Sequence, residues 1–416
     1  MISVHSIYLI ILVIIILDFV VERYFSYLNI KSLTPNIPKV LAQIYNPEEY
    51  TRMYNYYRRR DKHSMISSSV SFLVMVLFYS IGGFGWLDNY IRSFISSELV
   101  SGLVFMATLG IGSSIISFPF SYYSVFTIEQ KFGFNKSTHK TFFMDLAKGA
   151  LMGAVIGGLL YTLLYVVYSK TGSYFWLIGW GLISAFMLFM AKYYSSIIVP
   201  LFNKQSPLEE GVLRDTINEF SQKAGFQLDN IFVIDGSKRS TKANAYFTGL
   251  GSKKRIVLYD TLINDLEVEE IVAVLAHEIG HYKHKHTRKG MITSVIQTGV
   301  IFYLLSWFLK FPVFSYAMGA EVTSFYMSLM VFGLLFTPIE FILGFVMNIF
   351  SRKNEYQADA FAASYGLAEP LKSGLIKLSV NSLSNLTPHP LYVKVYYSHP
   401  TLLQRIEALN NIAIEK

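Results

Sequence analysis

Seven apolar stretches, each close to the length of a membrane-spanning helix, restrict this chain more than any other feature of its sequence. A helix needs about 20 mostly apolar residues to cross the hydrocarbon core of a bilayer. The stretches are Ile2–Val21, Met65–Phe84, Val100–Phe120, Gly149–Tyr168, Tyr174–Val199, Met291–Leu309 and Phe325–Phe350. Charged residues make up 15% of the chain, whereas soluble globular chains carry about 25%. The sequence therefore predicts a mainly α-helical membrane protein with about seven transmembrane helices.

The basic residues alternate between the loops that connect these stretches. The first, third and fifth loops and the tail each contain several Lys or Arg residues, whereas the other three loops contain one each, Arg92, Lys170 and Lys310. Cytoplasmic loops are enriched in Lys and Arg, so we expect an outside amino terminus and a cytoplasmic fifth loop and tail. Basic loops between apolar runs suit a lipid bilayer as partner and not a nucleic acid. The absence of cysteine and the compact loops favour a bacterial inner membrane over the endoplasmic reticulum.

Two polar segments, the fifth loop and the tail, hold the remaining elements. The fifth loop predicts a helix, three strands and a second helix, at Leu208–Ala224, Ile231–Ile234, Ala243–Thr248, Arg255–Tyr259 and Val268–Lys285. Segments of about 90 and 65 residues lie near the lower end of domain size, so we expect them to form one composite α+β domain. The predicted division is 1–199 for transmembrane helices one to five with their loops, 200–290 and 351–416 for the two parts of this domain, and 291–350 for helices six and seven.

One stretch of the fifth loop, AHEIGHYKHKHT at Ala276–Thr287, has the spacing of a metal site. His277 and His281 are four residues apart, so on a helix both imidazoles lie on one face and can bind one ion. Glu278 projects about 100° away, where it can act as general base toward a water on the metal. This is the H-E-x-x-H arrangement of catalytic zinc sites, which keep a position open for water. It predicts a peptidase in which metal-activated water attacks a peptide carbonyl.

The other two histidines of this stretch do not complete a known variant of the motif. A three-histidine site requires Gly at the seventh and His at the tenth position after the first His, and here those positions are His284 and Thr287. We therefore interpret His284 and His286 as parts of a basic juxtamembrane patch.

The third ligand is expected to be a carboxylate, since the chain has no cysteine. The tail contains NEYQADAFAASYG, in which Glu355 and Asp359 are four residues apart and share a helical face. We expect Glu355 to bind the metal and Asp359 to accept a hydrogen bond from a ligand imidazole. Glu340 is the rival acid, because a charge inside an apolar stretch is usually functional; we place it outside the ligand set.

These motifs, with others along most of the chain, resemble the type I CAAX prenyl proteases, integral-membrane zinc metallopeptidases of the a-factor-converting type. The resemblance rests on the zinc helix, on the third-ligand helix and on four further motifs. These are ANAYFTG at Ala243–Gly249, SHPTLLQRI at Ser398–Ile406, FTIEQKFGFNKSTHKTF at Phe126–Phe142 and PLFNKQSPL at Pro200–Leu208. The resemblance implies one Zn²⁺ per chain, a ring of membrane helices around a chamber, and a cytoplasmic gluzincin-like α+β protease domain.

The same resemblance implies roles for residues outside the metal site. Asn244 would bind the substrate backbone, with Ala243 and Tyr246 in an edge strand; an extended peptide can add to such an edge through main-chain hydrogen bonds. His399 would donate to the developing oxyanion, and Arg405 would orient that neighbourhood. The substrate would be a peptide or protein cut near a carboxyl-terminal CAAX motif, with or without a prenyl group. A local alternative for Ser398-His-Pro is a helix entry capped by Ser398.

Two other functions are compatible with the zinc motif. One is a quality-control membrane protease of the HtpX type. Proteins of that group are shorter and have fewer membrane spans, so the roughly 200 residues ahead of the fifth loop, with their five predicted spans, argue against it. The other is a non-catalytic channel or receptor with a structural metal. Glu278 argues against it, because a structural site has no use for a general base.

Overall fold

A computed structural model of the chain describes residues 3–228, 230–248 and 255–414. Ile2 and Gly249, which belong to a predicted span and a quoted motif, lie outside the described residues. Seven long helices are found within these ranges: α1 (Val4–Ser32), α2 (Pro47–Ser80), α4 (Glu98–Tyr123), α5 (His139–Thr171), α6 (Phe175–Ile197), α11 (His286–Phe308) and α13 (Phe325–Ser364). Among the described residues, six continuous helical segments are long and apolar enough to cross a membrane, and the 64-residue one contains both α5 and α6. The predicted helical membrane fold is confirmed.

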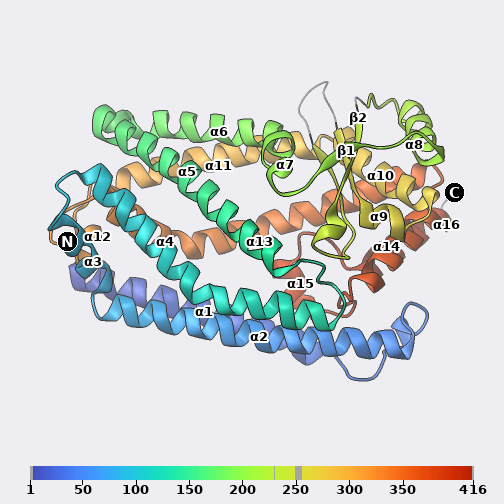
Figure 1. The fold of residues 1–416 in the computed structure, drawn as a ribbon, viewed down its shortest axis with the longest axis horizontal. Helices are drawn as coiled ribbons and strands as arrows, with labels where there is room; N and C mark the ends of the chain where they lie inside the picture. Colours follow the sequence, from blue (N-terminus) through green and yellow to red (C-terminus); the bar gives the residue numbers. More distant parts are fainter. Residues whose placement is uncertain (1–2, 229, 249–254, 415–416) are drawn as a thin grey trace.

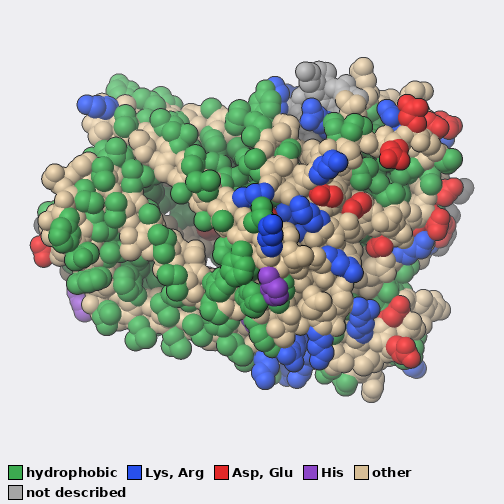
Figure 2. Space-filling view, viewed as in Figure 1, with side chains coloured by type: hydrophobic (Ala, Val, Ile, Leu, Met, Phe, Trp, Pro, Cys, Tyr) green, Lys and Arg blue, Asp and Glu red, His purple; other side chains and the backbone are tan. Residues whose placement is uncertain are grey.

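The long helices run along the long axis of the molecule (Figure 1). In that view α6 and α11 lie along one side, α1 and α2 along the opposite side, and α4, α5 and α13 cross the space between them. Apolar side chains cover one end, and its surface is hollowed between the helices, whereas charged side chains gather at the other end (Figure 2). The charged end holds the strands and the carboxyl terminus. The molecule is therefore divided into an apolar bundle and a polar end.

Glycine and proline affect the predicted spans differently. Pro119 and Pro338 remain inside α4 and α13, as membrane helices allow. Gly82 instead has a φ of 73°, a conformation that glycine adopts without steric cost. It separates α2 from α3 (Gly83–Arg92), so the second predicted span ends at Ser80 and not at Phe84.

The polar end combines short helices with one sheet. The remaining elements are α7 (Val199–Phe202), β1 (Gln205–Pro207), α8 (Val212–Lys223), β2 (Asn230–Ile234), β3 (Ala245–Thr248), β4 (Arg255–Tyr259), α9 (Asp260–Asp265), α10 (Val268–Lys283), α12 (Val313–Ala317), α14 (Ala368–Asn381), α15 (Pro390–Tyr396) and α16 (Leu402–Ile414), with short helical turns at Lys39–Leu41, Ser124–Glu129, Gly172–Tyr174 and Gly236–Lys238. The described strands have the order β1-β2-β4-β3. β2 and β4 are parallel and the other pairs antiparallel, which leaves β3 at an edge among the described strands.

The polar end is packed from chain segments that lie far apart in the sequence. Ile217 and Leu275 from the fifth loop share one hydrophobic core with Ala362, Leu371 and Leu409 from the tail. A second core joins the first polar loop, which runs from the end of α1 into the polar first half of α2, to the tail. It contains Leu41, Tyr45, Met53, Leu386 and Leu402. The fifth loop and the tail therefore bury apolar surface together, although the exact domain boundaries stay a prediction.

Candidate metal centre

The centre lies where α10 crosses α13, and a glycine lets the two helices approach closely. A Cβ atom on Gly280 would lie 3.0 Å from the Cα of Ala358 and 3.0 Å from the Cβ of Phe361. A side chain at this position would require α13 to shift by a few tenths of an ångström. The close approach sets the His-bearing face of α10 against Glu355 and Asp359 of α13, both of which are buried.

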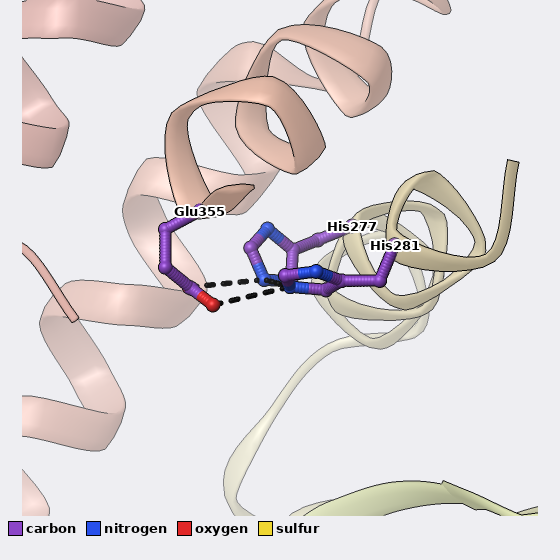
Figure 3. Close-up of side chains that lie close together, drawn as sticks. All are labelled: His277, His281 and Glu355. Atoms are coloured by element: carbon purple, nitrogen blue, oxygen red, sulfur yellow. Dashed lines mark hydrogen bonds and ion pairs between the residues drawn. The ribbon is translucent and has the colours of Figure 1, made fainter. Parts of the chain in front are cut away.

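Three side chains converge on one point between these helices (Figure 3). The Nε2 atom of His281 lies 3.1 Å from Oε1 of Glu355, and Nε2 of His277 lies 3.4 Å from Oε2 of the same carboxylate. The two Nε2 atoms are 3.1 Å apart. One potential ligand atom from each of the three residues lies within 4.8 Å of the other two. The structure thus brings together the three residues whose spacing in the sequence predicted a shared ion.

The carboxylate of Glu355 is suited to hold a cation at this point. Its side chain is 5% exposed, and its buried Oε2 atom has no hydrogen-bond donor among the described residues. A buried polar atom without a partner is rare and needs an explanation. Two imidazole nitrogens and a carboxylate oxygen form the donor set of a catalytic zinc site, so the residues present fit a metal ion.

Behind His277, a buried ion pair fixes the ring. The Nδ1 atom of His277 lies 2.8 Å from Oδ1 of Asp359. Arg405, from α16, donates to both Asp359 oxygens, through Nε at 2.9 Å and a terminal nitrogen at 2.6 Å. Asp359 and Arg405 are 1% and 9% exposed. This carboxylate therefore accepts bonds from the imidazole and from the guanidinium, and it holds the orientation of His277.

The electrostatics of His277 follow from these contacts. Burial lowers the pKa of the imidazole, but the Asp359 carboxylate at 2.8 Å and the Glu355 carboxylate at 3.4 Å outweigh burial and raise the pKa to about 9. When a cation displaces the proton from Nε2, which is directed at Glu355, Asp359 retains the proton on Nδ1. A nitrogen in that tautomer and direction is what a metal ligand requires.

His286 is not part of an exposed basic patch, and that prediction was wrong for this residue. It is 6% exposed. Its Nδ1 lies 3.0 Å from Nδ1 of His281, and its Nε2 lies 2.8 Å from Oε1 of Gln357. Helix α10 ends at Lys283, and Lys285 adopts a φ of 60°. This turn brings His286 back against His281, whereas a continuous helix would carry it to the opposite face. His284 is exposed, as expected for the patch.

His399 lies at the open side of the centre. Its Nε2 atom is 3.4 Å from Oε1 of Glu355, and its side chain is 63% exposed. Ser398 does not cap the following helix, contrary to the local alternative; its Oγ lies 2.9 Å from Nδ1 of His399. Thr401 takes the capping position instead, because Thr401 and Gln404 exchange backbone-to-side-chain hydrogen bonds. The chain before His399 is tied to α13 through Arg352, which donates to the carbonyl of Tyr397.

The predicted substrate strand is shorter than expected. β3 begins at Ala245, so Ala243 and Asn244 precede it. The side chain of Asn244 is exposed, and its Oδ1 accepts from the Ala245 amide at 2.9 Å. The hydroxyl of Tyr246 lies 3.1 Å from Oγ of Ser195 on α6. This contact joins the strand to the end of a membrane helix.

Comparison with known proteins agrees with this architecture. Residues 26–204 match the family description "CAAX prenyl protease N-terminal, five membrane helices", and residues 207–413 match peptidase family M48. The chain belongs to peptidase family M48. CAAX prenyl protease 1 of Saccharomyces cerevisiae is 35% identical over 96% of this chain and 94% of its own length. The Homo sapiens homolog is 31% identical over 92% and 90%.

A solved structure shares the fold over almost the whole chain. The crystal structure of S. mikatae Ste24p superposes with a TM-score of 0.92 at 34% identity, over 97% of this chain and 99% of that one. The chain is therefore an integral, multi-pass membrane metalloprotease, and the predicted enzyme class is confirmed. The shorter HtpX-type alternative is not favoured, because the match extends through the amino-terminal membrane helices. A channel or receptor without peptidase activity is likewise disfavoured.

Two polar residues of this M48 chain bear on the sequence predictions. Glu340 is exposed on α13 and lies 15 residues before Glu355, about 22 Å away along a helix, so it is remote from the centre. Gln357, which contacts His286, was missed by the sequence analysis. Its position two residues after Glu355 carried no recognisable signal, since its role depends on the turn at Lys285.

Proposed function

We propose that this chain is a zinc endopeptidase that cleaves peptide bonds near the carboxyl terminus of CAAX-type protein substrates, prenylated ones included. The observation that carries the proposal is the convergence of His277, His281 and Glu355 on one point, with Glu278 on the same helix as the two histidines. CAAX processing is proposed because the relatives that match almost the whole chain are named CAAX prenyl protease 1.

In this proposal His277, His281 and Glu355 hold one Zn²⁺. The bound ion supplies Lewis acidity, which polarises a carbonyl and lowers the pKa of a water. Zinc is the preferred ion because nitrogen and carboxylate ligands, without thiolates, are typical of catalytic zinc sites. Asp359, held by Arg405, keeps His277 in the tautomer that such a ligand needs.

Glu278 is proposed as the general base. It is half-buried on α10, one residue from His277, and the helix turns it about 100° from the ligand face. Its carboxylate would take the proton from the attacking water and deliver it to the leaving nitrogen. A half-buried position leaves part of this carboxylate accessible to a substrate.

His399 and the edge strand are proposed to bind the substrate. The exposed imidazole of His399, within 3.4 Å of Glu355, is close enough to the centre to donate to an oxyanion, a contribution of about 3–4 kcal/mol for one such donor. The edge strand β3, which contains Tyr246, and the preceding Ala243 and Asn244 are proposed to pair with an extended substrate. Tyr246 reaches α6, so this strand would lie next to the membrane surface.

We propose that the polar end faces the cytoplasm, with the amino terminus on the other side. The support is the alternation of basic and non-basic loops. In this orientation a substrate anchored in the cytoplasmic leaflet would present its carboxyl terminus to the centre. No nucleic acid has a part in the proposal.

The experiment uses the purified, zinc-loaded protein with farnesylated and unfarnesylated CAAX peptides, and mass spectrometry locates the cut. We expect cleavage near the CAAX motif, faster for the farnesylated peptide, and its loss in Glu278→Gln while zinc stays bound. Glu340→Gln is the matched control, since that acid lies far from the centre, and it should cleave normally. Cleavage that survives in Glu278→Gln would refute the mechanism, and equal cleavage of both peptides would refute a prenyl preference.

A further inference from the structure

A basic cavity lies at the side of the bundle, away from the metal centre. Its volume is about 970 Å³, and its walls come from α2, the end of α1 and the segment after Ser124–Glu129. Its cationic side chains are Arg52, Arg58, Arg59, Lys62 and Lys131. Glu48 and Asp61 are the carboxylates in the lining, so the wall carries an excess of three positive charges. Lys and Arg side chains gather along this edge of the molecule (Figure 2).

The cations of this cavity are not neutralised by ion pairs with carboxylates. None of the five lies within 4.0 Å of a carboxylate oxygen among the described residues, although other Lys and Arg residues of the chain do. Arg59 donates to the hydroxyl of Tyr123, and Arg52 donates to the carbonyl of Phe132. Neutral groups therefore position two guanidinium groups without cancelling their charge, and all five cationic side chains are exposed.

The cavity is located at the boundary between the apolar bundle and the polar end. Met65, which also lines it, begins the apolar stretch of α2, and Lys62 lies one turn before it. Ile30 of α1 and Met65 supply apolar walls next to the cations. An anionic group bound here would therefore sit at headgroup depth, with any attached chain along the apolar surface.

We propose that this cavity binds the phosphate of an anionic phospholipid headgroup. Lys and Arg that are free of carboxylate partners bind phosphate oxygens through charge-assisted hydrogen bonds. The adjacent apolar wall favours a phosphate that carries acyl chains over a free anion. The proposal is independent of the peptidase reaction, since the lining contains none of the residues of the metal centre.

The test titrates full-length protein in detergent with phosphatidylglycerol or phosphatidylcholine and counts bound lipid by native mass spectrometry. We expect tighter binding of phosphatidylglycerol. The double variant Lys62→Gln/Lys131→Gln should lose about tenfold or more of that affinity, given the usual contribution of a cation near a membrane surface. Neither side chain makes a hydrogen bond or an ion pair with the residues that the structure describes. Arg58→Gln, made separately, should shift the affinity in the same direction.

The matched control is Lys170→Gln/Lys310→Gln, which removes two exposed cations outside the cavity, one in the last turn of α5 and one just after α11. It should bind phosphatidylglycerol as the wild type does, and both double variants should cleave a soluble peptide normally. Equal affinity of the Lys62/Lys131 variant and the control would overturn the site. Displacement of the lipid by an equal concentration of inorganic phosphate would overturn the lipid as its occupant.

Discussion

At the scale of single residues, Asp359 links the helix of the two histidines to the carboxyl-terminal helix. It contacts His277 on α10 and Arg405 on α16, and all three side chains are buried. Breaking a buried pair by removing one partner is strongly destabilising, because the other charge is left without compensation. The carboxylate therefore has two effects, one on the tautomer of a proposed ligand and one on the charge of a buried arginine.

Asp359→Asn tests the first of these effects. The substitution keeps the shape but removes the charge that orients His277, and loss of such a supporting group typically weakens metal binding 10–100-fold. Competition against a zinc chelator measures the affinity. Asp265→Asn is the control, because Asp265 accepts a hydrogen bond at the surface from Asn381 and contacts none of the residues of the centre that the structure describes. An Asp359→Asn protein with wild-type zinc affinity would contradict the assigned role.

A second residue-level prediction concerns His286. Replacing it with Ala removes the group that lies against Nδ1 of His281, so zinc affinity should fall about tenfold or more. His284→Ala, two residues away and exposed, should leave the affinity unchanged. The same chelator competition separates the two variants. Equal affinities would show that the contact between the two imidazoles does not support the metal.

The residue pattern predicted the ligand set but not all of its support. The four-residue spacings of His277–His281 and Glu355–Asp359 follow from helical periodicity and can be recognised in the sequence. His286 could not be recognised in this way, because its place depends on a left-handed backbone at Lys285. Such a conformation is uncommon for a residue with a side chain, and nothing in the local sequence signals it.

At the scale of elements, the first turn of α10 is held by Glu270. Its carboxylate accepts from Lys377 at 2.8 Å and from Ser373 at 2.6 Å, both on α14, and also from the Glu267 amide at 2.9 Å. Burial raises the pKa of Glu270, but these hydrogen bonds outweigh burial and leave the pKa below its ordinary value of 4.5. The residue therefore links the helix that carries the histidines to the carboxyl-terminal tail.

Glu270→Gln should lower the stability of the protein at neutral pH by about 1–2 kcal/mol. The pKa is lower in the folded state than in the unfolded state, so the charge stabilises the fold fully above about pH 4.5 and progressively less as the pH falls below that value. Melting temperatures in detergent at pH 7 and below pH 4.5 measure the difference from wild type. A gap that stays constant across this range would contradict the electrostatic explanation.

Element boundaries were less predictable than element types. The strand Arg255–Tyr259 was predicted with its observed bounds. The helix expected from Leu208 begins at Val212 instead, because the Leu208 amide donates to the carbonyl of Ile231 and so extends the pairing of β1 with β2. The competing partner lies 23 residues away, which a local periodicity cannot reveal.

At the scale of the whole molecule, two cores hold the polar end together without a metal. Side chains from the fifth loop, the tail and the first polar loop interlock in them. The seven long helices and the resemblance to a prenyl protease were available from the sequence. The packing of these distant segments was not, since it depends on contacts between residues more than 100 positions apart. Orientation and the choice of a bacterial membrane stay predictions.

Removal of the metal should therefore separate activity from folding. A chelator is expected to abolish peptide cleavage while the helical circular-dichroism signal stays near that of the loaded protein, because these cores do not include the metal. Added zinc should restore cleavage. Extensive loss of helix on chelation would contradict the account, since it would mean that the ion holds the fold as well as the reaction.

The most direct test of the central claim is anomalous scattering from crystals of the zinc-loaded protein, measured at the zinc absorption edge. The account predicts a single peak per chain, about 2.0–2.2 Å from Nε2 of His277, from Nε2 of His281 and from a Glu355 oxygen. A peak bonded to other side chains, or one from which the Glu355 carboxylate is beyond bonding distance, would contradict it.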